Sequence, residues 1–464
     1  MKQSIWLFAF VLLFLSCSGS DGPTGGGTPL PTPNPEPPTN PTTYSDTELL
    51  EMVKKDVTKY FWDYAETNSK LARERYHTDN PALDQDVVTT GGSGFGILTI
   101  LVAERNGFVS RSEAVGRFSM MLDFLEKADR FHGAWPHWID GKTGNVKPFS
   151  TYDDGGDLVE TAFLAQSLIV LREYFKNSSL ESEKAIAQKA DALWKGIEWS
   201  FYTQNQNTLY WHYSPNYQFQ IGMKLQGFDE TLITYVLAAS SPTYPISKAV
   251  YDGGWARSGN IRSASSQYGI PVLVNHNGQN GNVGPMFWSH YSFLALDPRG
   301  LSDSYVNYGQ AVENHAKIQH QYAIANPKGW SGYGTKSWGL TASYSRNSDG
   351  STGYSAHAPN NDLGVISPTA ALSSMPYVKE ASMSHLRYLY NEKKSQYVGE
   401  MGPYDAYSDH FNWVTPRYLA IDQGTISPMI ENAKDGFIWN LFMNAPEIKE
   451  GLTKLGFHSS QHGF

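Results

Sequence analysis

Residues 150–175 read STYDDGGDLVETAFLAQSLIVLREYF, and this stretch decides the fold. From Leu158 onward its apolar residues recur every three or four positions, which is the spacing of an α-helix with a buried face. Ahead of that helix the chain is polar, rich in glycine and strongly acidic. The stretch therefore predicts a helix whose beginning lies beside a polar loop.

Helical spacing recurs along the rest of the chain. Between the helical windows lie long loops rich in Gly, Pro, Trp and Tyr, whereas runs with the period of two residues typical of strands are few. We therefore expect an all-α fold in which helical hairpins form a ring, an (α/α) toroid, with long loops that form a cleft at one end. A helical-repeat solenoid is the structural alternative, but the sequence has no fixed repeat length. The windows are 47–65, 112–128, 156–175, 183–199, 230–239, 301–324 and 424–443.

The first residues resemble a bacterial lipoprotein signal. Lys2 precedes an almost wholly apolar run, 5–15, which is too short to span a bilayer. The run ends in Leu15-Ser16-Cys17-Ser18, which resembles a lipobox, and Cys17 is the only cysteine. We expect residues 1–17 to be a signal peptide that ends at a lipidated Cys17. The protein would then be an outer membrane lipoprotein that faces the periplasm or the cell surface. The alternative is an ordinary signal peptide that ends near a cysteine by chance.

Composition divides the remainder into a tether and one domain. Residues 18–43 are dominated by Gly, Pro, Thr, Ser and Asn, which predicts an extended linker. Residues 44–464 contain no second stretch of this kind, and we expect them to form a single catalytic domain. With its one cysteine at position 17, the domain has no disulfide, thiol nucleophile or cysteine-ligated metal. The formal net charge of -9, with no run of Lys and Arg, argues against a nucleic-acid partner.

The loop and first helical turn of the opening stretch hold the carboxylates of Asp153, Asp154, Asp157 and Glu160. Asp157 and Glu160 lie three residues apart and so share one face of the helix. One or two acids at a helix N-terminus serve as caps and interact favourably with the helix dipole, which is the purely structural interpretation. This cluster exceeds that need. Mutual repulsion should raise the pKa of at least one carboxyl group, as catalysis by an acid or a base requires.

Two further acidic residues follow loops that lead into predicted helices. Glu230 follows Asp229 in a glycine loop, and Asp422 follows apolar residues and precedes Gln423, with Glu431 further along the same helix. An ionised carboxylate beside apolar residues is costly unless it has a partner. Capping explains each of these acids nearly as well as a functional role does, so the spacing leaves both interpretations open.

Aromatic residues make up 14% of the chain, and many occur in polar, glycine-rich segments rather than in periodic apolar ones. Aromatic faces exposed in loops bind pyranose rings by stacking, and His residues among them can donate hydrogen bonds to sugar hydroxyls. The alternative for any one ring is that it fills the core. The candidate substrate-binding residues are Asp153, Asp154, Trp135, Trp138, Trp211, His290, Trp338, Gln423 and Glu431.

Two other motifs lack the details of the sites that they resemble. The run Gly91-Gly92-Ser93-Gly94-Phe95-Gly96 lacks the Lys-Ser/Thr ending and the preceding strand of a phosphate-binding loop, so we interpret it as a glycine-rich loop against the cleft. The sequence has no His-Glu-x-x-His helix, and the spacing from His137 to Asp140 is no recognised metal signature. We expect that the chemistry requires neither a metal nor a cofactor.

Several spaced segments carry a family resemblance: TTGGSGFG (89–96), YDDGGDLVE (152–160), GFDE (227–230), WGLTAS (338–343), AIDQG (420–424) and IEN (430–432). Together they resemble the bacterial glucoamylase-like domain of glycoside hydrolase family 144, over nearly all of the chain after the tether. The resemblance implies an (α/α)6 barrel. It also implies hydrolysis of β-1,2-glucan or sophoro-oligosaccharides with inversion at the anomeric carbon, by internal cleavage or by release of short units.

An inverting glycosidase needs one carboxylic acid that protonates the leaving oxygen and one carboxylate that activates water, about 6.5–9.5 Å apart. Glu230 and Asp422 are far apart in sequence and can face each other across a ring. By the resemblance, they occupy the positions of the family's acidic pair. We predict that Glu230 is the general acid and Asp422 the general base. Asp157 and Glu160 then help to bind substrate and tune pKa values, or one of them is the base.

Two other functions share some of these features. A non-catalytic glycan-binding lipoprotein would have the lipobox, the tether and the aromatic residues, but it would not need three acidic helix beginnings. A polysaccharide lyase on a similar toroid would use a Tyr or His base, with an Arg or Ca²⁺ that neutralises a uronate. The scarcity of basic residues near the acidic motifs argues against such a substrate.

Overall fold

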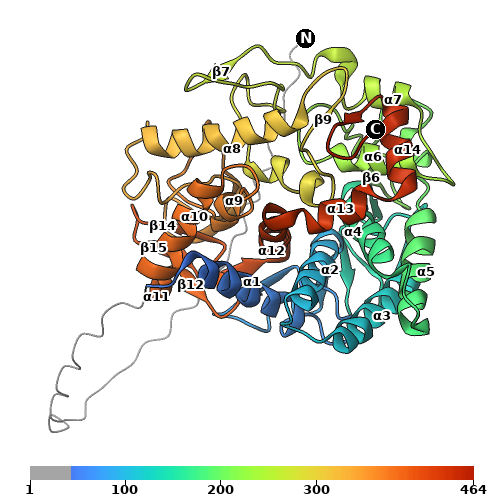
Figure 1. Ribbon diagram of the computed structural model, residues 1–464, viewed down its shortest axis with the longest axis horizontal. Helices are drawn as coiled ribbons and strands as arrows, with labels where there is room; N and C mark the ends of the chain where they lie inside the picture. Colours follow the sequence, from blue (N-terminus) through green and yellow to red (C-terminus); the bar gives the residue numbers. More distant parts are fainter. Residues whose placement is uncertain (1–42) are drawn as a thin grey trace, which may run out of the picture. The chain divides into compact units, whose positions relative to one another are not determined.

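Residues 43–464, the part of the chain that the computed structural model describes, form a ring of helices (Figure 1). Helices buried along nearly their whole length form the inner ring, in which neighbours contact one another and α12 closes onto α2. Two 3₁₀ helices, η3 (Met286–Ser289) and η4 (Ser292–Leu294), take the sixth inner position. The arrangement confirms the predicted (α/α)6 barrel. The inner helices are α2 (Thr90–Arg105), α4 (Leu158–Phe175), α6 (Leu232–Ser240), α9 (Pro368–Leu372) and α12 (Ala420–Asp435).

Helices with one apolar face surround this ring. A capping box closes the first turn of α1 and of α3. The side chain of Ser45 or Ser110 accepts a hydrogen bond from the backbone N–H of the Glu three residues on, and that Glu side chain accepts one from the serine's backbone N–H. The outer helices are α1 (Asp46–Trp62), α3 (Arg111–Lys127), α5 (Glu181–Lys195), α8 (Tyr308–Ala325) and α10 (Lys379–Arg387). Shorter helices are α7 (Lys248–Gly253), α11 (Lys394–Tyr397), α13 (Phe437–Met443), α14 (Pro446–Leu455), η1 (Phe201–Thr203), η2 (Arg257–Gly259) and η5 (Tyr388–Glu392).

The glycine-rich run 91–96 is not a loop, as the sequence had suggested, but the first turns of α2. A Cβ at Gly91 would lie 2.6 Å from Glu160 Oε2, and a Cβ at Gly94 would lie 2.6 Å from the carbonyl oxygen of Phe163. The glycines are therefore required by close helix packing, since α2 lies directly against α4 on one side and α12 on the other. Periodicity could not reveal this helix because its packing face consists of residues without side chains.

Most predicted windows match a helix, with shifted ends. The window 424–443 is two helices, because Gly436 adopts a left-handed φ of 74° between α12 and α13. The window 301–324 begins as a strand and becomes helical only at Tyr308. Besides α2, the sequence interpretation missed α9, α10 and α14, which are short or lie among polar residues.

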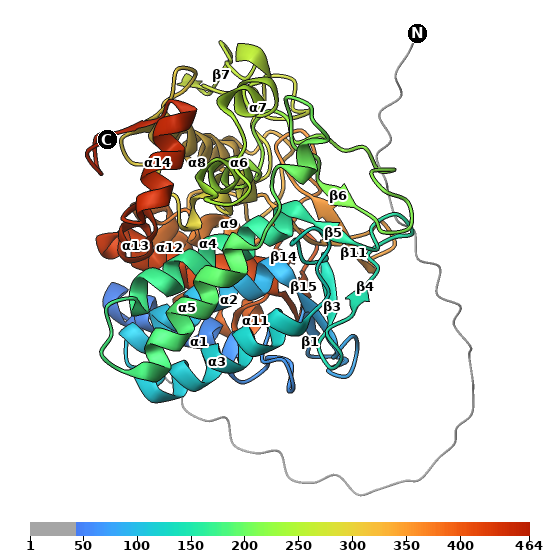
Figure 2. The ribbon, with the colours of Figure 1, turned by 90° about the vertical axis from the view of Figure 1, so that its right-hand side faces the viewer.

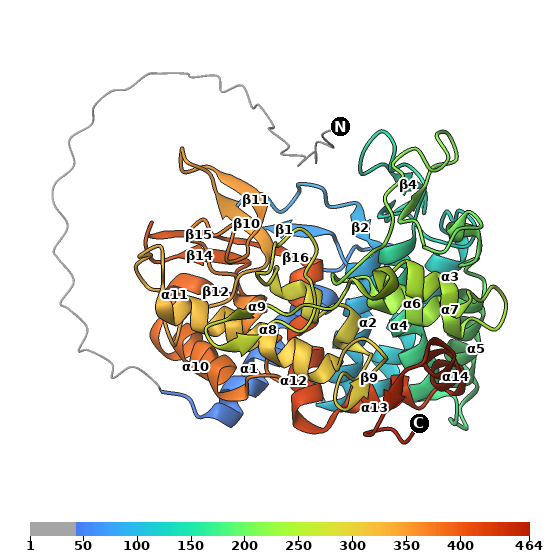
Figure 3. The ribbon, with the colours of Figure 1, turned by 90° about the horizontal axis from the view of Figure 1, so that it is seen from above.

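The strands in residues 43–464 are two to five residues long, and most of them gather at one end of the helices (Figures 2 and 3). They are β1 (Arg75–His77), β2 (Val87–Thr89), β3 (Trp138–Asp140), β4 (Val146–Lys147), β5 (Gly156–Asp157), β6 (His212–Tyr213), β7 (Ser266–Gln267), β8 (Ile270–Pro271), β9 (Leu301–Ser302), β10 (Ala342–Arg346), β11 (Thr352–Ala356), β12 (Val398–Gly399), β13 (Gly402–Pro403), β14 (Ala406–Ser408), β15 (Trp413–Thr415), β16 (Arg417–Leu419) and β17 (His458–Ser459).

Two antiparallel pairings and one hairpin lie at this end, and the two pairings bring distant loops together. Strand β5 pairs with β6, so that Asp157 lies opposite His212. Strand β1 pairs with β16, the strand that runs directly into α12. The hairpin β10–β11 places Tyr344 opposite Tyr354. These pairings position the acidic side chains described below.

The predicted signal peptide, 1–17, with Cys17, and the tether up to residue 42 lie outside the described residues. Within residues 43–464, no helix is both long and apolar enough to cross a membrane.

Candidate active site

The N-terminus of α4 holds the first part of the site. Asp157 is its N-cap, and Oδ1 accepts hydrogen bonds of 2.9 Å from the backbone N–H groups of Val159 and Glu160. Its other oxygen, Oδ2, lies 3.0 Å from His137 Nδ1 and 3.5 Å from His212 Nε2. Asp157 thus serves as a cap, as the structural interpretation required, and also contacts two imidazoles.

Asp153 completes this group of acids and imidazoles. Its Oδ2 lies 3.3 Å from His212 Nε2 and 3.9 Å from His137 Nδ1. Burial favours neutral imidazoles, but the carboxylates of Glu160, Asp157 and Asp153 raise the pKa of His137 to about 10. Hydrogen bonds to Asp153 and Asp157 likewise outweigh burial and raise the pKa of His212 to about 9. Both imidazoles are therefore cations at neutral pH and compensate the two aspartates.

One ligand atom from each of His137, Asp153 and Asp157 lies within 4.8 Å of the others, a spacing that could hold a metal ion. Imidazole nitrogen and carboxylate oxygen are ligands that Zn²⁺ accepts. The same atoms are already satisfied by the imidazolium–carboxylate contacts. Two arrangements are thus open to these residues, and removal of metal distinguishes them.

Glu160, one turn into α4, is also buried but has a different environment. Its Oε2 accepts hydrogen bonds from Gly91 N at 2.7 Å and from Thr89 Oγ1 at 3.3 Å. Burial raises the pKa of Glu160 to about 7, and the charge of Asp157 adds to the effect while His137 opposes it. The sequence predicted one raised pKa in this cluster from repulsion. The direction is as predicted, but burial is the larger cause.

Asp154 faces away from these acids. Its Oδ2 accepts a hydrogen bond of 2.7 Å from Asn216 Nδ2, which joins the loop before β5 to the loop after β6. Among the four acids that the sequence grouped together, Asp154 thus holds two loops to each other.

Glu230 lies in the turn that precedes α6. Its neighbour Asp229 accepts hydrogen bonds from Thr231 and Asn277, whereas no hydrogen bond or ion pair to the Glu230 carboxyl group is found among residues 43–464. Burial, followed by the charge of Asp229 and those of Glu160 and Asp157, raises the pKa of Glu230 well above its usual value. The side chain is only half-buried. A carboxyl group that keeps its proton and faces solvent is suited to donate that proton to a substrate.

Asp422 lies in the first turn of α12 and is 3% exposed. Its Oδ1 accepts a hydrogen bond of 3.3 Å from Tyr291 Oη, and no ion pair to it is found in the described residues. Burial and then the neighbouring carboxyl group of Asp405 raise the pKa of Asp422 well above its usual value. The sequence predicted this desolvation from the preceding apolar residues, but not the second aspartate.

Tyr291 connects the separate acids. Its ring packs against Phe95 of α2 and Phe163 of α4, with ring centres 5.2 and 5.5 Å away. Burial raises the pKa of Tyr291 well above its usual value, and the charges of Asp422, Glu230 and Glu160 add to this. Tyr291 therefore lies among acids from three inner helices or their first turns. We call Asp153, Asp157, Glu160, Glu230, Asp405 and Asp422 the acidic site.

Exposed aromatic rings occur on the loops around the acidic site. Tyr354, on β11, is 61% exposed, and the ring of Phe149 stacks on that of His137 with centres 4.4 Å apart. Tyr152 and Tyr217 form an edge-to-face pair with ring centres 5.0 Å apart. The sequence interpretation missed these rings because it weighted Trp. Of its own candidates, Trp138 and Trp211 are half-buried and remain available for sugar stacking.

Five other substrate-binding candidates require correction, because the fold uses their side chains internally. Trp135 and Trp338 are 0% exposed, and their indole N–H groups donate to the carbonyls of Leu125 and Ala381. A fully buried ring cannot stack on a sugar. His290 bonds to Ser374, Gln423 donates to the carbonyls of Met401 and Pro403, and Glu431 forms ion pairs with Lys54 and Arg105.

Comparison with known proteins identifies chains that are similar to this one over most of its length. A family model described as "Putative glucoamylase" matches residues 222–446. An endo-β-1,2-glucanase from Chitinophaga pinensis, solved with sophorotriose and glucose, is 50% identical; the match covers 90% of this chain and 99% of that one, with a TM-score of 0.87. A glucoamylase-like protein from Bacteroides fragilis is 47% identical over 92% of this chain and 100% of its own, also with a TM-score of 0.87.

A curated relative from Parabacteroides distasonis is named an exo-β-1,2-glucooligosaccharide sophorohydrolase acting at the non-reducing end. It is 42% identical over 434 residues, and the match covers 89% of this chain but 59% of the relative, so the chain spans well under two thirds of that protein. These matches, together with the ring of helices, define a protein of the (α/α)6 class. The chain belongs to the glucoamylase-like family, glycoside hydrolase family 144.

Proposed function

We propose that this chain hydrolyses β-1,2-glucan or sophoro-oligosaccharides by an inverting mechanism. The observation that carries the proposal is the pair formed by Glu230 and Asp422. Each has a pKa raised well above its usual value and no cationic partner in residues 43–464. Unpaired buried carboxyl groups cost stability and concentrate where their protons are used. The names of the relatives from Chitinophaga pinensis and Parabacteroides distasonis support the choice of linkage.

In the proposed reaction, Glu230 donates its proton to the leaving glycosidic oxygen. Asp422 accepts a proton from the water that attacks the anomeric carbon from the opposite side. The half-exposed position of Glu230 lets its proton reach a substrate, while the buried position of Asp422 suits a base that acts through one ordered water. Solvent then returns a proton to Glu230 and takes one from Asp422.

Around Glu230 and Asp422, the proposed substrate contacts come from loops that carry charged side chains and from loops that carry aromatic rings. The imidazolium groups of His137 and His212, which are half-buried, offer charged hydrogen-bond donors for sugar hydroxyls, while Asp153 and Asp157 compensate their charge. The exposed ring of Tyr354 and the half-buried ring of Trp138 offer stacking surfaces.

The direct test is a product profile over linear β-1,2-, β-1,3-, β-1,4- and α-1,4-glucans. We expect new reducing ends only from the β-1,2-glucan and, by NMR of the first products, the α-anomer that inversion generates. The lengths of the products distinguish internal cleavage from release of sophorose. Binding of β-1,2-glucan without new reducing ends would favour a glycan-binding protein instead, and products that absorb in the ultraviolet would indicate a lyase.

We also propose that the protein is anchored to the outer membrane by a lipid on Cys17. The supporting observation is the apolar run 5–15 that ends in the lipobox-like Leu15-Ser16-Cys17, followed by the tether. Changing Cys17→Ala should prevent incorporation of labelled fatty acid and release the protein from the membrane fraction. Unchanged labelling would disprove the anchor while leaving the proposed activity untouched.

A further inference from the structure

The loop between β13 and β14 brings a second aspartate to the side chain of Asp422. Asp405 is 5% exposed, its backbone N–H donates to the carbonyl of Arg417, and its Oδ2 accepts a hydrogen bond of 2.7 Å from the backbone N–H of Tyr344. Its position is thus held by β16 and β10, on either side. No feature of the local sequence, YDAYSD, indicates that it reaches the first turn of α12.

Among residues 43–464, each of the two carboxyl groups has one oxygen left without a hydrogen-bond partner. Asp405 Oδ1 and Asp422 Oδ2 are both buried, and neither has a hydrogen-bond donor among the described residues. A hydrogen bond between the two carboxyl groups lowers the pKa of Asp405 and raises the pKa of Asp422. Because an ionised carboxylate is only an acceptor, this contact exists only when one of the two groups carries a proton. A single shared proton satisfies both oxygens.

Within residues 43–464, no ion pair compensates the charge of Asp405 and Asp422. Tyr291 Oη donates to Asp422 Oδ1, and the charges of Asp422 and Asp405 add to the raised pKa of Tyr354 on β11. Glu74, just before β1, adds a further negative charge that acts on both aspartates. The neighbouring Arg75 is bound to Glu74 and so is engaged elsewhere. Two ionised carboxylates would repel each other here, whereas one shared proton leaves a net charge of about −1 that the hydrogen bond spreads over both groups.

We propose that Asp405 is a positioning residue for Asp422: the two carboxyl groups share one proton between Asp405 Oδ1 and Asp422 Oδ2, and Asp405 holds this proton whenever Asp422 acts as the base. The inference rests on the proposed function of Asp422. Asp422 Oδ1 is then the oxygen that takes a proton from the attacking water and later releases it to solvent. The proton shared with Asp405 is not consumed, so the pair returns to its starting state after each turnover.

Two substitutions separate this role from a merely structural one. Asp405→Asn keeps an oxygen for Tyr344 N–H and supplies an N–H that donates to Asp422 without any titrating proton. We expect its kcat to stay within a few-fold of the wild type. Asp405→Ala removes the donor, and we expect kcat to fall by roughly 10- to 100-fold with little change in KM, which is less than the loss of the base itself.

Infrared spectroscopy tests the shared proton without using activity. At about pH 8, where ordinary carboxyl groups are ionised, the wild-type minus Asp405→Asn difference spectrum should show the C=O stretch of one protonated carboxyl group, over and above any band from Glu230, which both proteins retain. Asp409→Asn is the matched control, because Asp409 lies just after β14 and is bonded to Tyr388 and Tyr397, outside the acidic site. It should leave both the C=O band and kcat unchanged.

Three results would overturn the proposal: full kcat in Asp405→Ala, an equal loss of kcat in Asp405→Asn and Asp405→Ala, or a C=O band unchanged in Asp405→Asn. If Asp405→Ala fails to fold, the Asn variant and the infrared band still decide. A wild-type protein inactive on β-1,2-glucan would refute the proposed function, and the infrared result would then stand alone as the test of the shared proton.

Discussion

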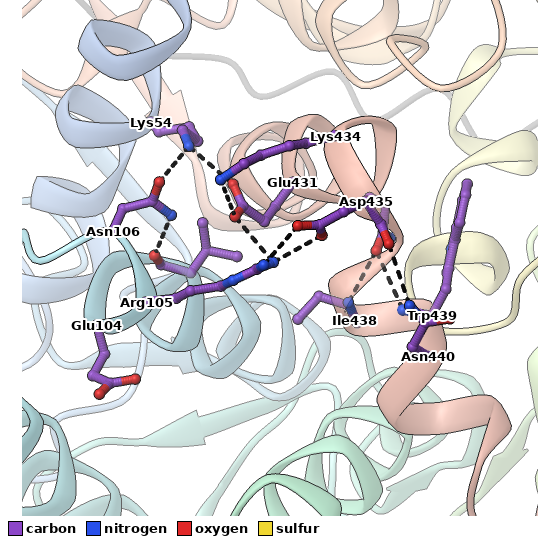
Figure 4. Close-up of polar contacts among 12 residues, drawn as sticks. Lys54, Glu104, Arg105, Asn106, Glu431, Lys434, Asp435, Ile438, Trp439 and Asn440 are labelled. Atoms are coloured by element: carbon purple, nitrogen blue, oxygen red, sulfur yellow. Dashed lines mark hydrogen bonds and ion pairs between the residues drawn. The ribbon is translucent and has the colours of Figure 1, made fainter.

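Helix α12 carries a buried carboxylate near each end, and the two have opposite environments. Asp422, in the first turn, is 3% exposed, and Glu431, nine residues on, is 0% exposed. At the Glu431 end, Lys54 Nζ lies 2.9 Å and Arg105 Nη1 3.1 Å from the carboxylate (Figure 4). At the Asp422 end, the nearest ionisable partners are another aspartate and a tyrosine.

The pKa values follow these partners rather than burial. Burial alone would raise both values, yet the hydrogen bond and charge of Lys54, with the charges of Lys434 and Arg105, hold the pKa of Glu431 below its usual value. The pKa of Asp422 is raised well above its usual value because burial and the carboxyl group of Asp405 outweigh the hydrogen bond from Tyr291. The comparison shows that Glu431 has a structural role, since its ion pairs join α12 to α1 and α2. Asp422 lacks such pairs and costs stability, and its burial is accounted for by a role in the reaction.

The largest effect on kcat should come from substitution of Glu230 or Asp422, the two acids that have no cationic partner in residues 43–464. Glu230→Gln and Asp422→Asn keep the shape of each side chain but remove its titrating proton, and each should lower kcat on β-1,2-glucan by roughly 10²–10⁴-fold. Thermal unfolding should show no loss of stability, because each substitution removes a carboxyl group that burial disfavours.

An aryl glycoside whose leaving group needs no protonation sharpens this test. Glu230→Gln should recover activity on it, provided the site accepts the substrate, whereas Asp422→Asn should not. If Asp157→Asn or Glu160→Gln were the crippling change while Asp422→Asn stayed active, the base would belong to the α4 cluster.

At the other end of α12, Glu431→Gln should affect stability and leave catalysis intact. The change leaves Lys54, whose side chain is 8% exposed, without its buried partner. We expect a loss of about 3 kcal/mol in the free energy of unfolding, measured with denaturant at neutral pH. The kcat per folded molecule should match the wild type. A lower kcat with unchanged stability would make Glu431 a site residue and break the comparison.

The two ends should also differ in the pH dependence of stability. The pKa of Glu431 is lowered on folding, so its contribution is present above the unfolded value and is lost as the pH falls through the folded value. The destabilisation of Glu431→Gln should therefore shrink in acid. Equal destabilisation at every pH would indicate a packing effect in place of the ion pairs.

Glu160 should show the opposite sign. Its pKa, raised to about 7, means that its contribution to stability is present below the unfolded value and is lost as the pH rises through about 7. Glu160→Gln cannot lose a proton, so its melting temperature relative to the wild type should be higher at about pH 8 than at about pH 5. A difference that does not change with pH would show that Glu160 is not protonated in the folded protein.

The smallest expected effect is that of metal removal. If His137, Asp153 and Asp157 pair as imidazolium and carboxylate, dialysis against a chelator should leave both kcat and the melting temperature unchanged. Loss of activity that Zn²⁺ or Ca²⁺ restores would instead assign a metal to these residues. His212→Gln, which keeps a polar group beside Asp153 and Asp157, then tests whether the second imidazole takes part.

Much of this protein could be predicted from local patterns. Helical periodicity predicted the helices around Leu158 and Leu232, since a helix that buries apolar residues must repeat them with its own period. The acids Asp157, Glu160, Glu230 and Asp422 were found because each sits at the start of a helix, where a few neighbouring residues define its position.

Other features lay beyond local patterns because distant segments create them. The glycines of α2 signal a helix only once α4 and α12 lie against it. Trp135 and Trp138 are alike in sequence, yet only their packing makes the first a core residue and leaves the second half-exposed. Tyr354 reaches the acidic site only because a hairpin carries it there.

The sequence by itself determined the helical class, the family and which carboxyl groups stand at helix beginnings, because periodicity and short motifs are local. Only the tertiary structure decided which buried carboxylate meets a cation. Glu431 meets Lys54 across 377 positions of the chain, and Asp422 meets Asp405 where two loops converge. The charge of a buried group depends on what surrounds it in space, and the pKa values that distinguish a structural acid from a chemical one therefore arise only when the ring closes.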